Sequence, residues 1–318
     1  ALVDGATADV GAQTPKGNLV WELIGAGLGA TDDPVIINHG PSTTHKHAEW
    51  QAGQRSLPAM LPATRAIKRI TDFMFDDDRI VGGTQARPNE FPYQISLRRL
   101  GSHICGGSIY KSNWIITAAH CTDGTSVGSM SIVAGEHSLS IDSGDEQYSD
   151  ILSKTEHEAY SSRTQENDIC LLRLSSPLSL NTKVNVVRLP AQGAETAEAQ
   201  GAETAEGTNC VVSGWGTTSS GGSTIPDILR KVTVPIVSDA TCRDSYGATS
   251  ITNSMICAGF RLGGADSCQG DSGGPLVDEG TNLLIGVVSW GIGCADPGYY
   301  GVYTQVSYFH NWVVGIAG

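Results

Sequence analysis

Short apolar runs, rich in β-branched and aromatic residues, alternate with polar, glycine-containing stretches throughout the chain after residue 80. The runs are YQISLRRL, WIITAA, SIVAGE, ICLLRL, NCVVSGWG, KVTVPIV, LLIGVVSW and GVYTQV. Runs of this length, separated by turn residues at short intervals, are typical of strands in β-barrels or in a β-sandwich. The stretch SYFHNWVVGI predicts one short helix at the C-terminus. The pattern therefore favours an all-β fold.

Residues 1–79 show neither a helical nor a strand period. They mix glycine, alanine, proline and threonine with scattered charges, a composition that is typical of poorly ordered segments. Short helices near Leu19–Leu28 or Pro62–Phe75 are the regular elements that this segment could form. Two interpretations stay open, a disordered leader and a propeptide that shields a site downstream.

The octapeptide AQGAETAE occupies residues 191–198 and again residues 199–206. A perfect tandem copy indicates a duplication in a loop that tolerates insertions. The repeat separates a first block of strands, about 80–190, from a second block, about 207–318. We interpret it as an acidic surface connector, without a catalytic part, between the halves of one domain spanning 80–318.

Charge and cysteine content narrow the function classes. The net charge of −13 argues against nucleic acid as a partner and is compatible with cationic substrates. No apolar run reaches the roughly 18 residues of a membrane span. All eight cysteines follow residue 104 and none forms a CxxC pair, so disulfides in a secreted protein are favoured over a zinc site. Ala1 is not an initiator methionine, and we infer that a secretion signal was removed.

The segment GDSGGP, residues 270–275, is the strongest local signal for chemistry. Its glycines let the backbone bend sharply and present the Ser272 hydroxyl together with nearby N–H groups. Serine needs a base to act as a nucleophile. TAAHC supplies His120 beside Cys121, and NDICLL supplies Asp168 at the start of an apolar run, where a carboxylate needs a hydrogen-bonding partner.

Taken together, the motifs resemble the chymotrypsin/trypsin family of serine proteases, and arthropod trypsins most closely. The matching segments are IVGG (80–83), TAAHC, NDI, GWG (214–216), DSCQGDSGGP and VSWG (288–291). They occur in the family's order of histidine, aspartate and serine. The resemblance covers about residues 80–318 and leaves out the leader. It implies two six-stranded antiparallel β-barrels with a short C-terminal helix and a site between the barrels, preceded by a largely irregular propeptide.

The resemblance implies a role for each matching residue. Ser272 would be the nucleophile, His120 the general base and acid, and Asp168 the group that orients the imidazole. The backbone N–H groups of Gly270 and Ser272 would form the oxyanion hole, and Ser289 would hydrogen-bond Asp168. Such acyl transfer requires no cofactor.

Asp266 stands six residues before Ser272, at the position that resembles the acidic floor of the trypsin pocket. Gly291 and Gly301 match the pocket walls, where they leave room for a long side chain, and Ser289 lies on the same substrate-binding segment. A buried carboxylate at the end of an open slot suits arginine or lysine. The alternative is that Asp266 is a charge on a surface loop. Its spacing of six residues from Ser272, which matches the pocket position of the family, disfavours this alternative.

The segment FDDDRIVGG, residues 75–83, resembles the activation site of a zymogen. Cleavage after Arg79 would free the ammonium of Ile80, which in the family turns inward and pairs with the aspartate before the nucleophile, here Asp271. The arginine makes this bond a substrate for an activating protease of trypsin-like specificity. We expect the three preceding aspartates to slow self-cleavage by repelling the acidic pocket.

Six cysteines match disulfides of the family. The implied pairs are Cys105–Cys121, Cys242–Cys257 and Cys268–Cys294. Cys210 matches a family cysteine whose partner position is here Asp278, and Cys170 stands where the family has an apolar residue. We expect these two cysteines to lie in different barrels as free buried thiols rather than as a fourth disulfide.

Two cation sites have alternative interpretations. The loop GEHSLSIDSGDEQ resembles the calcium loop of trypsins, with Glu136 and Glu146 at two ligand positions and Ser143 in place of a third carboxylate. A structural calcium ion and a solvated acidic turn are equal alternatives there. Tyr300, before Gly301, stands where sodium-binding relatives carry an aromatic residue, and simple packing is favoured over a sodium site.

We therefore expect a secreted, monomeric trypsin-like endopeptidase that works through an acyl-enzyme and cleaves after arginine or lysine. Its expected partners are basic peptide substrates, an activating protease and protein protease inhibitors, without nucleic acid or membrane. The alternative is a protease homologue that acts as a binding or regulatory protein. Such homologues typically lack a triad residue, whereas His120, Asp168 and Ser272 are all present.

Overall fold

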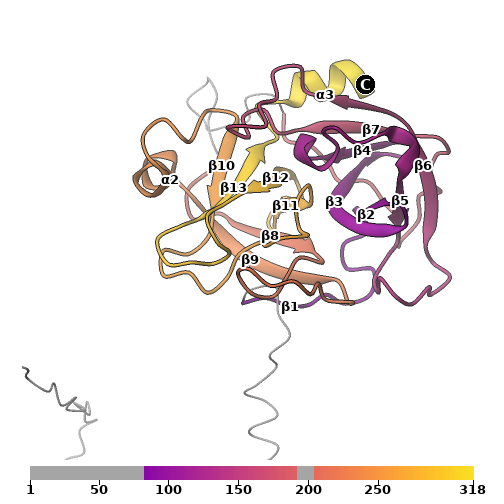
Figure 1. The fold of residues 1–318 in the computed structure, drawn as a ribbon, viewed down its shortest axis with the longest axis horizontal. Coiled ribbons are helices and arrows are strands. Elements are labelled where there is room, and N and C mark those ends of the chain that lie inside the picture. The colour runs from indigo at the N-terminus through magenta and orange to yellow at the C-terminus, as the bar shows by residue number, and fades with distance from the viewer. Residues whose placement is uncertain (1–81, 192–203) are drawn as a thin grey trace, which may run out of the picture. The chain divides into compact units, whose positions relative to one another are not determined.

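A computed structural model describes residues 82–191 and 204–318 of the chain (Figure 1). The leader with its expected helices, Arg79 and Ile80 at the predicted activation site, and most of the acidic repeat lie outside the described residues. The described part consists mainly of antiparallel strands that form two closed barrels. None of its helices is long and apolar enough to cross a bilayer.

The first barrel has the strand order β2-β3-β4-β7-β6-β5 and closes through the pairing of β2 with β5. Its strands are β2 (Gln94–Arg99), β3 (Ser102–Lys111), β4 (Trp114–Thr117), β5 (Met130–Ala134), β6 (Gln147–Glu156) and β7 (Cys170–Leu174). Alternate residues of these strands point inward, as a pleated strand requires. Among the side chains fully buried in this core are Ile95, Leu97, Ile109, Ile116, Ile132 and Leu171.

The second barrel follows the acidic repeat and closes through the pairing of β8 with β9. Its strands are β8 (Asn209–Gly214), β9 (Arg230–Val237), β10 (Met255–Ala258), β11 (Pro275–Asp278), β12 (Leu284–Trp290) and β13 (Gly301–Gln305). Helix α2 (Asp239–Tyr246) lies between β9 and β10 and begins at Ser238, whose hydroxyl accepts the Thr241 N–H. The predicted fold class, two six-stranded antiparallel barrels with a short C-terminal helix, is confirmed.

The two ends of the described domain each cross to the opposite barrel. Strand β1 (Thr84–Gln85) precedes the first barrel in sequence but pairs with β9 of the second. Helix α3 (His310–Ala317) follows the second barrel, yet it buries Val313 and Ala317 in an apolar cluster that consists mainly of first-barrel residues and also includes residues of β11 and β12. Figure 1 shows the yellow helix α3 beside the purple strands of the first barrel. These crossings bind the two barrels to each other.

Strand β3 is one of four barrel strands that the apolar pattern did not reveal, together with β6, β10 and β11. Two adjacent glycines interrupt its apolar run. A side-chain carbon at Gly106 would lie 2.9 Å from the backbone of Gly274, and one at Gly107 would lie 2.8 Å from Ile95. The glycines are therefore required because β3 approaches the Ser272 loop and the barrel core too closely for side chains.

Three disulfides join Cys105–Cys121, Cys242–Cys257 and Cys268–Cys294, the pairs that the family resemblance implies. The first ties β3 to the short 3₁₀ helix η1 (Ala119–Cys121), and the last joins two loops beside a pocket. Cys170 on β7 and Cys210 on β8 are buried and unbonded. Cys210 faces Asp278 across the β8–β11 pairing, so the position opposite this thiol holds a carboxylate.

We expect the native protein to resist thiol reagents and the denatured, unreduced protein to take up two equivalents. Burial raises the pKa of both Cys170 and Cys210 to about 12, and the thiolate is the reactive form. Intact mass after iodoacetamide treatment, with and without denaturant, measures the uptake. A denatured protein that takes up no label would instead contain a fourth disulfide.

Candidate active site

Asp168 is a fully buried carboxylate at the junction of the two barrels. Its Oδ1 accepts the backbone N–H of His120 at 2.9 Å, and its Oδ2 lies 2.7 Å from the His120 Nδ1. The Ser289 hydroxyl on β12 donates to the same Oδ2 at 2.5 Å. The Thr304 hydroxyl on β13 donates to the Asp168 carbonyl at 2.6 Å. Groups from both barrels therefore satisfy this carboxylate and fix the imidazole of His120.

Ser272 lies in a tight loop before β11 and is held through its backbone. Its carbonyl accepts the Gly106 N–H at 2.8 Å, and the Gly274 N–H returns to the Asp271 carbonyl at 2.8 Å. A side-chain carbon at Gly273, where φ is 74°, would lie 2.2 Å from the Thr117 hydroxyl. No hydrogen bond joins the Ser272 hydroxyl to His120, two residues that the structure describes. Such contacts often tighten only when a substrate is bound.

Two backbone donors beside Ser272 are unused. Within the described part of the chain, the N–H groups of Gly270 and Ser272 make no hydrogen bond. Gly270 has a φ of 102°, a left-handed conformation that favours glycine, and its carbonyl lies 3.1 Å from the His103 Nε2. The other ring nitrogen of His103 lies 2.8 Å from the Ser96 hydroxyl. The two free N–H groups are thus available to a developing negative charge.

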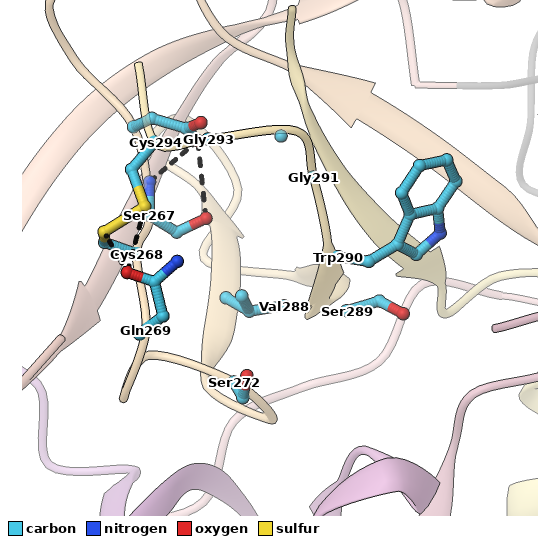
Figure 2. A pocket seen from close by; sticks show the side chains of 12 residues that line it. Ser267, Cys268, Gln269, Ser272, Val288, Ser289, Trp290, Gly291, Gly293 and Cys294 are labelled. Atoms are coloured by element: carbon cyan, nitrogen blue, oxygen red, sulfur yellow. Dashed lines mark hydrogen bonds between the residues drawn. A yellow bond between two sulfur atoms is a disulfide. The ribbon is translucent and has the colours of Figure 1, made fainter. Parts of the chain in front are cut away.

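A cavity of about 190 Å³ opens beside Ser272. Its wall runs from Val288 through Ser289 and Trp290 to Gly291, and the Cys268–Cys294 disulfide lies along the opposite side (Figure 2). Asp266 and Gly301 also line this space. The cavity therefore brings together the four residues that the resemblance assigns to substrate binding.

Asp266 is 6% exposed and carries no ion pair within the described residues. Its Oδ1 accepts the Ser267 N–H at 2.7 Å, and its Oδ2 accepts the Ala295 N–H at 3.2 Å. Burial raises the pKa of Asp266 to about 6, although the N–H donors oppose the rise. A side-chain carbon at Gly301 would lie 2.6 Å from the Asp266 carboxylate. Only glycine there leaves this carboxylate open to a ligand.

Asp271 is a second buried carboxylate and has no exposed surface. It accepts the N–H groups of Gly216 at 2.7 Å and Cys268 at 2.9 Å, and no cationic side chain of the described residues pairs with it. Burial raises the pKa of Asp271 to about 7. Side-chain carbons at Gly214 and Gly216 would overlap its oxygens. The glycines of the GWG segment thus make room for a carboxylate that lacks a cation.

The acidic side chains of the loop that resembles a calcium site are bound by groups of the protein itself. Glu136 binds the Arg98 guanidinium, and Glu146 accepts backbone N–H groups from Ser143, Gly144 and Asp145. Lys183 pairs with Asp145 at 2.5 Å. Calcium takes six to eight oxygen ligands from carboxylates, carbonyls and water, and the described residues place no three carboxylates together in this loop. Side chains of the protein itself supply the positive charge in this loop.

The single group of three metal-ligating residues in the described ranges is Cys105, His120 and Cys121. Two of them form a disulfide, so this group is not a metal site. Tyr300, the residue predicted either to pack or to sit at a sodium site, is buried at 6% exposure. Its carbonyl accepts the Tyr246 hydroxyl at 2.5 Å. Tyr300 is thus packed in the interior, with its carbonyl held by a protein donor.

His103 and Tyr246 are residues of this region that sequence reasoning missed. His103 joins Ser96 to Gly270 and contacts the Trp215 ring edge-on, with the ring centroids 5.4 Å apart. The Tyr246 hydroxyl donates to the Tyr300 carbonyl. The Tyr246 ring packs against the Trp290 ring, with the ring centroids 4.9 Å apart. No local motif marks either residue, because the contacts that join them to the site, with Gly270 and Tyr300, are 167 and 54 positions away in the sequence.

Known proteins are similar in sequence to most of this chain. Residues 80–313 match the family model described as Trypsin. Trypsin-1 of Astacus astacus is 51% identical over 243 residues, which cover 74% of this chain and 98% of that protein. Cationic trypsin-3 of Rattus norvegicus and trypsin of Sus scrofa are each 44% identical over 238 residues. Those matches cover 75% of this chain and 89% and 95% of the two relatives.

We expect Arg98→Gln to destabilise the protein more at pH 8 than at pH 5. Burial raises the pKa of Glu136 to about 7 against the opposing charge of Arg98. At pH 5 the Glu136 carboxyl is protonated in the folded state and needs no cation. At pH 8 the Glu136 carboxylate of the Arg98→Gln variant would be buried and charged without its partner. Breaking a buried pair costs about 3 kcal/mol, which lowers Tm by roughly 6–12 °C in a domain of this size.

Thermal unfolding at the two pH values, with and without EDTA, measures the effect. Arg99→Gln is the matched control, because Arg99 is the next residue on β2 and is exposed. EDTA should leave the wild-type Tm unchanged. A large EDTA effect on the wild type, with none from Arg98→Gln, would show that calcium and not Arg98 holds this loop.

Proposed function

The chain belongs to the trypsin family of serine endopeptidases, and we propose that it cleaves peptide bonds after arginine and lysine as a secreted enzyme made in zymogen form. The observation that carries this proposal is the buried, unpaired Asp266 in the cavity beside Ser272. A carboxylate in such a site gains most from a ligand that brings its own positive charge. The three disulfides support an oxidising, extracellular location.

In the proposed mechanism the Ser272 hydroxyl attacks the carbonyl carbon of the scissile bond, while His120 accepts its proton. Asp168, hydrogen-bonded to the His120 Nδ1, stabilises the imidazolium that forms. The free N–H groups of Gly270 and Ser272 receive the oxyanion, and each such donor contributes roughly 10²–10³ in rate. His120 then protonates the leaving amine, and water hydrolyses the acyl-enzyme by the reverse sequence.

The cavity explains the proposed preference for arginine and lysine. The cavity is open at Gly291, since a side-chain carbon at this position would meet no atom closer than 3.7 Å. A long aliphatic stem can pass along this wall to Asp266. The incoming cation replaces the missing charge partner, and it lowers the pKa of Asp266 from its raised value.

Activation is proposed to supply the partner that Asp271 lacks. Cleavage after Arg79 would produce an ammonium at Ile80, two residues before Gly82. Gly82 lies against the loop that leads to Asp266, because a side-chain carbon on it would lie 2.0 Å from the Gly264 carbonyl. The new terminus is therefore close to the segment that carries Asp271. Pairing with the ammonium would stabilise this segment and, with it, the N–H groups of Gly270 and Ser272.

Asp266→Ser should remove most activity toward arginyl and lysyl peptides and leave the fold intact. Loss of one partner of a buried charge pair costs roughly 2–5 kcal/mol, so we expect kcat/KM to fall by roughly 30-fold to several thousandfold. Specificity constants for arginyl, lysyl and phenylalanyl amides measure the change, with Tm as the control for folding. An unchanged preference for basic residues would overturn the role of Asp266.

Arg79→Gln should leave the chain inactive after treatment with an activating protease, and its stability should fall as pH rises. In the uncut chain the folded pKa of Asp271 is about 7, above the ordinary value of 3.8. The folded state therefore binds this proton more tightly than the unfolded state, so stability declines as pH rises from about 4 to above 7. Pairing with the Ile80 ammonium would remove this decline.

The measurement compares Tm at pH 5 and pH 8 for Arg79→Gln with and without Asp271→Asn. The double variant should lose less stability between the two pH values, because asparagine does not titrate. Equal slopes would show that Asp271 is already neutralised in the uncut chain. Full amidase activity of treated Arg79→Gln would contradict the activation site itself.

A further inference from the structure

We propose that Arg98 is a positioning residue for the oxyanion hole, where it fixes the backbone of Gly270, although it does not line the cavity. It acts through two intervening side chains, Ser96 and His103. The inference rests on the proposed function, because it gives Arg98 a part in that reaction. It follows from a chain of contacts that begins at Glu136 and ends at the Gly270 carbonyl.

Arg98 makes contacts with two different nitrogens of its guanidinium. Its Nη2 binds the Glu136 carboxylate, and its Nε donates to the Ser96 hydroxyl over a long 3.5 Å. The Ser96 hydroxyl lies 2.8 Å from the His103 Nδ1, and the His103 Nε2 lies 3.1 Å from the Gly270 carbonyl. Ser96 and the Glu136 side chain are buried, and the Arg98 side chain is 16% exposed. The chain of contacts is therefore largely shielded from solvent.

The donor and acceptor roles along this chain follow from its two ends. A carbonyl can only accept, so His103 must carry a proton on the Nε2 that faces Gly270. Burial lowers the pKa of His103 and the Arg98 charge adds to this effect, against the opposing hydrogen bond to Gly270, so the neutral ring is favoured and its Nδ1 accepts. Ser96 must therefore donate to His103. The Ser96 oxygen is left to accept from Arg98, which can only donate.

Arg98 gives the Ser96 hydroxyl its direction. A serine hydroxyl can rotate, and it can either donate or accept. Because Arg98 donates to the Ser96 oxygen, the Ser96 proton is directed toward His103. The imidazole is then bonded at both nitrogens and packs edge-on against the Trp215 ring, with the ring centroids 5.4 Å apart. These contacts hold the ring against the Gly270 carbonyl.

Gly270 is the residue that needs such support. Its φ is 102°, and glycine has wide access to other conformations. Among the described residues, His103 is the hydrogen-bond donor to the Gly270 carbonyl. This carbonyl belongs to the peptide group that joins Gly270 to Asp271, between the two N–H groups of the oxyanion hole. Fixing it therefore fixes the direction of the Gly270 N–H relative to the Ser272 N–H.

A second contact joins the loop of Glu136 to His103. The next residue is His137, whose carbonyl accepts the Trp215 indole N–H at 3.4 Å. Trp215 is fully buried, and its ring packs against His103. The loop thus reaches His103 from two sides, through Arg98 and through Trp215. Its position and that of the imidazole are therefore linked.

The alternative is that Arg98 stabilises only the loop of Glu136. The two roles use different atoms, because Nη2 binds Glu136 and Nε binds Ser96. Lysine can keep the ion pair with Glu136, but its single ammonium lacks the fork that reaches two separate acceptors. Arg98→Lys therefore separates the roles, since it keeps the ion pair and removes the contact with Ser96. Ser96→Ala breaks the chain from the other side and leaves the pair untouched.

The test asks whether Arg98→Lys and Ser96→Ala act on the same step. Wild type, both variants and the double variant are activated as full chains by an immobilised trypsin that is then removed. Each single change should lower kcat for an arginyl amide roughly three- to tenfold, less than the roughly 10²–10³ of a direct oxyanion donor, and leave KM unchanged. The double variant should lose no more than the larger single loss, because both changes break one chain.

Two inhibitors locate the effect. Benzamidine, an aryl amidinium, reports on the cavity that holds Asp266, and its Ki should stay constant. A peptide aldehyde that ends in arginine forms a tetrahedral adduct on Ser272, whose oxygen would occupy the oxyanion hole. Its Ki should rise by about the factor by which kcat falls. Arg99→Lys, at the next and exposed position of β2, is the matched control and should behave as wild type.

Three results would overturn the role of Arg98. These are an unchanged kcat in both single variants, losses that multiply in the double variant, and equal weakening of benzamidine and the aldehyde. Thermal unfolding accompanies each assay, and Ser96→Ala alone decides the matter if Arg98→Lys lowers Tm below the assay temperature. All three results leave the proposed function intact. If wild type hydrolyses no arginyl amide and does not bind benzamidine, the proposed function fails, and the role of Arg98 with it.

Discussion

The hydrogen bonds of the buried Asp168 carboxylate are the interaction that links the geometry of the site to the contact between the two barrels. A charge without exposed surface is tolerated only if its oxygens are hydrogen-bonded. Here the donors come from His120 beside the first barrel and from Ser289 on β12 of the second. His120 contacts both oxygens of this carboxylate, and Ser289 adds the donor that comes from the second barrel. The carboxylate that holds the imidazole is therefore also a point of contact between the two barrels.

Three buried aspartates of the site are stabilised in different ways, and the differences match their environments. Asp168 is surrounded by side-chain and backbone donors. Asp266 and Asp271 receive only backbone N–H groups and one serine hydroxyl, and burial raises the pKa of both. A buried carboxylate that has no cationic partner is stabilised in its charged form when a cation binds next to it. In the proposed enzyme one cation is the substrate side chain and the other is the new N-terminus, so both events use the same physical principle.

The sequence was most informative where a residue's role is encoded in its immediate neighbours. The apolar strands and the serine, histidine and aspartate motifs were located in this way, and the structure joins His120 to Asp168 and places Ser272 at a cavity. Strands interrupted by glycine, such as β3, were missed because the reason for Gly106 lies in the distant Gly274. Arg98 and His103 were missed for the same reason, since their partners are 38 and 167 positions away. Pairwise contacts at that range leave no local pattern.

The position of β1 explains how one cut could change the site without releasing the chain. Thr84 and Gln85 are paired to β9, so the segment before them stays anchored to the second barrel after cleavage. Gly82 packs so closely against Gly264 and Ala265 that no side chain fits between them. Ile80 precedes Gly82 by two residues in the sequence, and two extended residues span at most about 7 Å. In the proposed activation, the new ammonium would therefore stay near the loop that carries Asp266 and Asp271. Within that loop Asp271 is the carboxylate that has no exposed surface and no cationic partner among the described residues, so it would be the group that gains most from the proposed ammonium.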